Sequence, residues 1–103
     1  MPHPSPIVAK LGGALLDAPG ALDAFWESVR ALRETTPVVV VHGGGQQATA
    51  LAQRLGHEPR IVQGRRVTSE VDLQIVQWAM RGELNLPLVA QAARHGLTAV
   101  GLS

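Results

Sequence analysis

Apolar runs alternate with amphipathic stretches along this chain, and the runs end at glycine. Segment 7–11 is mainly apolar and stops at Gly12, and the valine run 38–41 is followed by His42 and Gly43. Apolar runs without regular alternation are typical of strands buried on both faces of a parallel sheet. Between them, apolar residues at three- and four-residue steps predict an amphipathic helix over 20–34. The pattern therefore predicts parallel strands joined by a helical crossover, which is an α/β fold.

Helical periodicity continues in the second half of the chain. The helix that follows the second glycine turn is expected to end before Gly56, a residue type favoured just past a helix C-terminus. Ser69 and Asp72 have the spacing of a helix start, and Gly82 is expected to end that helix. Asn85 is expected to cap a last helix.

Three further segments complete the predicted pattern. Two apolar pairs around a glycine in segment 60–68 predict a small hairpin or bent loop over the strand ends. Segment 69–81 is apolar over more than one helix face, which indicates either deep burial or a subunit contact. Segment 98–102 is expected to form another strand.

Composition limits the classes of function. Hydrophobic residues make up 46% of the 103 residues and charged residues 17%, so one globular domain is expected. A net charge of +1, with scattered basic residues, argues against a nucleic-acid partner. Cysteine is absent, which fits a reducing cytoplasm and excludes thiolate chemistry. We expect no membrane partner, because no segment has the ~18 apolar residues of a membrane span.

The glycine triplet Gly43, Gly44 and Gly45 lies where the valine run meets the following helix. Glycines allow a sharp turn, and they let a ligand approach the peptide N–H groups at a helix start. The ligand could be a phosphate, a transferring phosphoryl group or a carboxylate. The alternative is a strand-to-helix turn that needs glycine only for packing.

Lys10 is the single lysine among nine basic residues, and it lies just before Gly12 and Gly13. If the two strands are parallel neighbours, both glycine turns open at the carboxyl edge of the sheet. A lysine beside two such turns suits phosphoryl transfer, because that reaction depends on positioning and charge stabilisation. The alternative is a lysine at a strand end whose ammonium simply reaches solvent.

Other motifs are weaker or absent. The P-loop pattern does not occur, which excludes a P-loop nucleotide site. A loose dinucleotide fingerprint begins at Gly43, but Gln63 stands where an acidic residue is required. The four histidines have no metal-ligand spacing, and His42 is interpreted as a hydrogen-bonded residue at a strand end rather than a base. Arg65 and Arg66 could be a solvated pair, or one could clamp a carboxylate.

Five segments resemble, in order and spacing, the N-terminal lobe of the acetylglutamate kinases of the amino-acid kinase family. They are Ala9–Asp17, Val40–Gly45, Gly64–Thr68, Gly82–Asn85 and Ala99–Ser103. The resemblance implies a three-layer αβα sandwich with a mainly parallel sheet. It also implies that residues 1–103 form an acetylglutamate-binding lobe without the C-terminal nucleotide-binding lobe, so that this chain alone is inactive.

The same resemblance implies an activity and a site. The activity is transfer of the ATP γ-phosphoryl group to the side-chain carboxylate of N-acetyl-L-glutamate in arginine biosynthesis, with Mg²⁺ accompanying ATP and no protein metal ligands. Lys10 would stabilise the transferring phosphoryl group, and Arg66 would bind the substrate α-carboxylate. The remaining implied site residues are Gly44 and Gly45 as backbone donors, Gly12 and Gly13 for phosphate approach, and Asn85.

The resemblance further implies a homodimer through helix 69–81. Two alternatives stay open. One is a related kinase for another carboxylate, such as carrier-linked aminoadipate, although the Gly64–Thr68 segment favours the free acetylated substrate. The other is a non-catalytic binding fragment.

Overall fold

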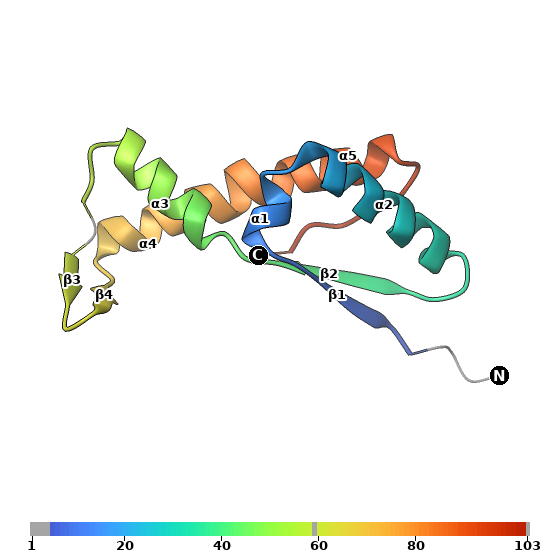
Figure 1. The fold of residues 1–103 in the computed structure, drawn as a ribbon, viewed down its shortest axis with the longest axis horizontal. Helices are drawn as coiled ribbons and strands as arrows, with labels where there is room; N and C mark the ends of the chain where they lie inside the picture. Colours follow the sequence, from blue (N-terminus) through green and yellow to red (C-terminus); the bar gives the residue numbers. More distant parts are fainter. Residues whose placement is uncertain (1–4, 59, 103) are drawn as a thin grey trace.

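A parallel pair of strands, covered by helices on one face, organises the first half of the chain (Figure 1). The computed structural model describes residues 5–58 and 60–102. Strand β1 (Ile7–Leu11) pairs in parallel with β2 (Val38–His42), and helix α2 (Pro19–Arg33) lies between them in sequence. These elements confirm the predicted strands, the predicted helix and the α/β class.

The main hydrophobic core lies between the strand pair and the helices α2 and α5 (Leu86–Arg94). Leu11 is fully buried there, and Trp26 donates its indole N–H to the side-chain oxygen of Gln91 at 3.1 Å. A buried indole N–H usually has a hydrogen-bond partner, and here that bond links α2 to α5. The core contains Leu11, Leu22, Trp26, Val29, Leu88, Ala92 and Leu97.

A second, smaller core lies farther along the molecule, where α3 (Gly45–Arg54) packs on α4 (Glu70–Gln77). The principal extents are 52 × 29 × 20 Å, and the radius of gyration of 16.1 Å exceeds the ~13 Å of a compact domain of this size. The molecule is therefore elongated, with two separate cores.

The predicted hairpin is confirmed as β3 (Arg60–Val62) paired antiparallel with β4 (Arg65–Val67). Gln63 and Gly64 both adopt positive φ angles, of 51° and 75°, which is the backbone that a two-residue hairpin turn requires. The predicted place was wrong, since the hairpin lies beyond α3 and α4 rather than over the strand ends (Figure 1).

One continuous helical rod runs from α4 through the π-helical segment η1 (Trp78–Asn85) into α5. The predictions that Gly82 ends a helix and that Asn85 caps the next were both wrong. Asn85 has helical angles (φ −63°, ψ −50°) and no capping hydrogen bond. The wider hydrogen-bond spacing of a π segment accommodates Pro87 without a break, because the N–H that proline lacks falls where the bonding pattern changes.

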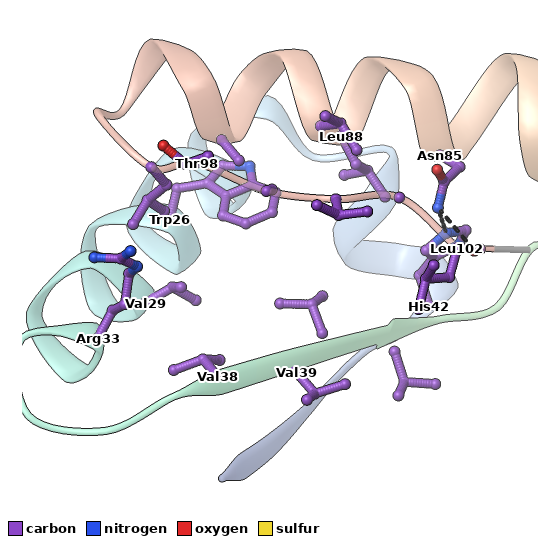
Figure 2. Close-up of a pocket in the computed structure, with 18 of the residues that line it drawn as sticks. Trp26, Val29, Arg33, Val38, Val39, His42, Asn85, Leu88, Thr98 and Leu102 are labelled. Carbon is purple, nitrogen blue, oxygen red and sulfur yellow. Dashed lines mark hydrogen bonds between the residues drawn. The ribbon is translucent and has the colours of Figure 1, made fainter.

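The predicted strand at residues 98–102 does not form. This segment is irregular, and no described strand pairs with β2 on the edge that faces away from β1. Val100 and Leu102 are largely exposed. A strand needs a partner edge, and the segment crosses over the sheet without meeting one (Figure 2).

The start of α4 confirms the predicted capping box and extends it. Ser69 and Asp72 exchange backbone and side-chain hydrogen bonds, and Asp72 also lies 2.7 Å from Nε2 of His57. Hydrogen bonds from the Ser69 backbone N–H, the Ser69 hydroxyl and His57 lower the pKa of Asp72 to about 2. This contribution to stability is present above the ordinary aspartate pKa and is lost only as pH falls towards 2.

His95, at the end of α5, binds two carboxylates of α2. Its Nδ1 lies 2.9 Å from Glu27 and its Nε2 lies 3.2 Å from Asp23. The hydrogen bond with Glu27, followed by that with Asp23, raises the pKa of His95 above 6.5. The folded state thus favours the protonated form of His95. The charged ring links α5 to the two carboxylates of α2.

We expect this contact to make stability depend on pH. Because the folded pKa is raised, its contribution is complete below about pH 6.5 and is lost as pH rises through the folded value. His95→Gln should therefore lower Tm more at pH 5.5 than at pH 9, as measured by thermal unfolding. A Tm difference that is the same at both pH values would contradict the charged contact. Glu27→Gln removes the carboxylate partner of the same contact and should show the same pH dependence.

Candidate active site

Two glycine turns meet at the carboxyl edge of the strand pair. In the parallel register Leu11 lies opposite His42, so Gly12 and Gly43 leave the two strands at the same level. The predicted juxtaposition of the two turns is therefore observed. It depends on the in-register pairing of β1 with β2, which places both strand ends at one edge.

Gln47, in the first turn of α3, ties the two turns together. Its side-chain nitrogen lies 3.5 Å from the Gly13 carbonyl and 3.3 Å from the Asp17 carboxylate. Its side-chain oxygen is buried without a hydrogen-bond partner among the described residues. The short helix α1 (Gly13–Leu16) is thereby held against the start of α3.

The glycines are required for different reasons. A Cβ at Gly44 would lie 2.7 Å from Leu84 and 3.1 Å from Met80, both in η1, so packing alone explains this glycine. A Cβ at Gly12 or Gly45 would meet nothing within 4 Å, and neither residue has a positive φ. Packing therefore does not explain why these two positions are glycine. The close approach of a ligand to the backbone would explain it.

This difference gives a test with a matched control. Gly44→Ala should destabilise the fold by about 1–3 kcal/mol, because Leu84 is buried and has little room to move. Gly45→Ala should change the free energy of unfolding by less than about 0.5 kcal/mol. Urea denaturation measures both. If both substitutions changed the free energy of unfolding equally, the contacts with η1 would not explain why position 44 requires glycine.

The start of α3 is suited to an anion. Gly44 occupies the N-cap position, and no side chain caps the first turn. The first backbone N–H groups of a helix have no partner within the helix, and the helix dipole favours negative charge there. Gly44 and Gly45 thus lie at an uncapped helix start beside the Gly12 turn.

Lys10 lies two residues before Gly12, on the sheet face that the helices leave open. In the register it pairs with Val41 and shares its face with Val8 and Val39. These three valines are 46–65% exposed. No hydrogen bond or ion pair joins Lys10 to another described residue, so its ammonium group is available to a ligand at the neighbouring edge.

His42, the last residue of β2, is hydrogen-bonded on both ring nitrogens, as its position at a strand end predicts. Its Nδ1 lies 2.9 Å from the Gly43 carbonyl oxygen, and its Nε2 lies 3.3 Å from the side-chain nitrogen of Asn85. The same Asn85 nitrogen lies 3.5 Å from the Leu102 carbonyl (Figure 2). This contact has no local signal in the sequence, because His42 and Asn85 are 43 positions apart.

A cavity of about 1150 Å³ lies along the free edge of β2, below α2, α5 and residues 97–102 (Figure 2). Valine, leucine and alanine side chains form much of its wall, with Arg33 at one end. It reaches the glycine turns only at His42, and Lys10 does not line it. We therefore place the candidate site at the glycine turns and interpret the cavity as unfilled space beside the sheet.

Other candidate residues do not meet at this edge. Arg65 and Arg66 belong to β4, and Figure 1 places that hairpin away from the ends of β1 and β2. The side chain of Arg66 lies outside the described residues, so its predicted role has no structural test here. No group of three or more histidine or acidic side chains in the described ranges could hold a metal ion. Nor is any described helix long and apolar enough to cross a membrane.

Comparisons with known proteins agree on one family. Residues 5–103 match the model of the amino acid kinase family. An acetylglutamate kinase of Anaeromyxobacter dehalogenans (strain 2CP-C) is 44% identical over 97 residues, which are 93% of this chain and 36% of the relative. An acetylglutamate kinase of Edwardsiella ictaluri (strain 93-146) is 41% identical over 100 residues, which are 95% of this chain and 39% of the relative.

Among solved structures, smu.665 of Streptococcus mutans UA159 superposes with a TM-score of 0.77 at 24% identity. The superposition covers 95% of this chain and 40% of that one. At this identity the likeness concerns the fold. The chain thus spans somewhat more than a third of the length of the proteins it matches.

Proposed function

Because the chain belongs to the amino acid kinase family, we propose that it is the acceptor-binding lobe of an acetylglutamate kinase. The reaction is transfer of the ATP γ-phosphoryl group to the side-chain carboxylate of N-acetyl-L-glutamate, a step of arginine biosynthesis. The curated relatives support the substrate, since they carry this activity in their names. In this proposal residues 1–103 bind the acceptor, and a nucleotide-binding lobe occupies the rest of the family length.

The pairing of the two glycine turns beside Lys10 carries this proposal. It combines backbone N–H groups at an uncapped helix start with one flexible cation at the same sheet edge. A transferring phosphoryl group spreads negative charge over its oxygens, and preorganised donors stabilise that charge. The geometry therefore supports phosphoryl transfer as the reaction at this sheet edge.

Each residue has a distinct role in the proposal. Lys10 stabilises the transferring phosphoryl group, and the N–H groups of Gly44 and Gly45 donate to acceptor and phosphoryl oxygens. Gly12 and Gly13 leave room for the phosphates. The family resemblance assigns Arg66 to the α-carboxylate of the acceptor, and this role requires the β3–β4 hairpin to lie nearer to the strand ends than it does in Figure 1. The acceptor carboxylate, with a pKa near 4.3, is ionised at neutral pH, so no general base has to remove a proton.

ATP with Mg²⁺ is the proposed phosphoryl donor. The described residues contain no cluster of metal ligands, so no step is assigned here to protein-bound Mg²⁺. The charge stabilisation that this chain can supply is that of Lys10 and the glycine N–H groups.

Binding measurements test the proposal against its alternatives. Calorimetry on the 103-residue chain should detect N-acetyl-L-glutamate but little ATP, because the proposal places the adenine and ribose site in the other lobe. Stronger binding of a carrier-linked aminoadipate would favour a related carboxylate kinase. If the chain bound none of these acceptors, the remaining hypothesis would be that it is a non-catalytic fragment.

Activity provides a second test. The 103-residue chain alone should form no acyl phosphate from ATP and N-acetyl-L-glutamate in a hydroxylamine trapping assay, since holding both substrates in line needs both lobes. A chain extended to the family length should turn over. Turnover by the short chain would refute the division of the site between two lobes.

A homodimer through helix 69–81 is also part of the proposal, together with a cytoplasmic location. Val71 and Trp78 lie seven residues apart on one side of the rod, and each is about half exposed. Their apolar surface has no cover among the described residues and suits a second copy. Sedimentation of Trp78→Lys should give a monomer, and an unchanged dimer would place the interface elsewhere.

A further inference from the structure

The direction of the Gly44 N–H is set by the Gly43 carbonyl. Both groups belong to one planar peptide unit, in which a trans bond makes the C=O and the N–H point in opposite directions. No described peptide bond is cis. Glycines on both sides leave this unit free to rotate as a whole. A group that holds the Gly43 oxygen therefore also aims the Gly44 N–H.

His42 is that group, and its two contacts specify one tautomer. The Gly43 oxygen can only accept, so Nδ1, at 2.9 Å, carries the proton. The Asn85 side-chain nitrogen can only donate, so Nε2, at 3.3 Å, presents its lone pair. The neutral ring protonated at Nδ1 satisfies both contacts together.

The orientation of Asn85 is itself constrained. Its nitrogen lies 3.5 Å from the Leu102 carbonyl, which is again an acceptor. Its oxygen occupies the space beside Gly101, where a Cβ would come within 2.1 Å of it. The C-terminal segment thus keeps the NH₂ group of Asn85 turned towards His42 (Figure 2).

We propose that Asn85 is a positioning residue for the glycine turn. It selects the His42 tautomer whose Nδ1–H holds the Gly43 carbonyl, and it thereby aims the Gly44 N–H at the bound anion. The identity of the anion rests on the proposed function. The tautomer and the orientation of the peptide rest on the hydrogen bonds alone.

Nuclear magnetic resonance on the ¹⁵N-labelled chain at pH 8 tests this proposal. The His42 ring should be protonated at Nδ1 and not at Nε2. In Asn85→Ala the Nδ1–H tautomer should lose its dominance, and the residual dipolar coupling of the Gly44 N–H should fall as its peptide gains freedom. Binding of N-acetyl-L-glutamate should weaken about tenfold, the effect of losing one hydrogen bond to a charged group.

His42→Asn supplies the rescue. Its side-chain NH₂ can donate to the Gly43 carbonyl without any choice of tautomer, so adding Asn85→Ala to His42→Asn should change neither the Gly44 coupling nor acceptor binding further. A role of Asn85 in stability alone would not be rescued in this way.

Three results would overturn the proposal. They are a wild-type ring protonated at Nε2, an Asn85→Ala protein with an unchanged ring and Gly44 coupling, and a failure of His42→Asn to rescue. If Asn85→Ala does not fold, the protonation of the His42 ring in the wild-type protein alone decides the proposal, and protonation at Nε2 rejects it. A correct tautomer in a chain that binds no acetylglutamate would reject the proposed function and leave this inference standing.

Discussion

Lys10→Ala is expected to lower kcat about 10²–10³-fold in a chain extended to the family length, while the KM for N-acetyl-L-glutamate changes little. The physical reason is that, in the proposed function, the ammonium group acts on charge that develops on the phosphoryl oxygens during transfer. An interaction made mainly in the transition state appears in kcat, whereas one made equally with bound substrate appears in KM.

Steady-state kinetics with both substrates checks this expectation. Arg30→Ala is a suitable control, because Arg30 is an exposed cation on α2 whose only described ion pair is with its neighbour Glu27. It should leave kcat unchanged. If Lys10→Ala turned over at the wild-type rate, Lys10 would be a solvated residue at a strand end and the phosphoryl group would need another cation.

Trp26→Ala is expected to destabilise the fold by about 3–5 kcal/mol, a large share of the ~5–15 kcal/mol that stabilises a typical domain. Trp26 is 5% exposed, packs edge-on against Phe25 with ring centroids 5.1 Å apart, and is bonded to Gln91. Its loss would remove the hydrogen bond to Gln91 and core contacts between α2 and α5. The cavity beside it would enlarge, since Trp26 forms part of the wall.

The second tryptophan provides the control. Trp78 is 54% exposed, so Trp78→Ala should change the free energy of unfolding by less than about 0.5 kcal/mol when the protein is dilute enough to be monomeric. Trp26→Phe should cost less than Trp26→Ala, because it keeps a ring in the core and loses the hydrogen bond. Similar losses for Trp26→Ala and Trp78→Ala in urea denaturation would contradict the described core.

The predictable part of this fold is the part that local sequence determines. The period of apolar residues predicted β1, α2, β2 and α3, and the Ser69–Asp72 spacing predicted the start of α4. Gly82 and Asn85 misled the prediction of helix ends, because both lie within a rod that packs along both cores. The packing of neighbouring elements overrode their local preference.

The candidate site divides in the same way. The predicted strand ends and their glycines indicated where Lys10 and the two turns lie, because parallel pairing brings such strand ends to one edge. The bond of His42 to Asn85, and the contact of Gly44 with Leu84, join distant parts of the chain and have no local signal. Segment 98–102 has the residues of a strand, but strand formation also depends on a neighbour that sequence does not reveal.

The bare edge of β2 has a consequence for the protein in a concentrated solution. Four consecutive valines, Val38 to Val41, carry no charge and display unpaired backbone groups along that edge. β-Branched, uncharged edges are templates for strands from other molecules, and one device against such growth is a nearby charge. Lys10, opposite Val41 on the open face, is the one charged side chain within the strand pair. The residue that we propose for phosphoryl transfer is thus also the one charge in the strand pair that would oppose such growth.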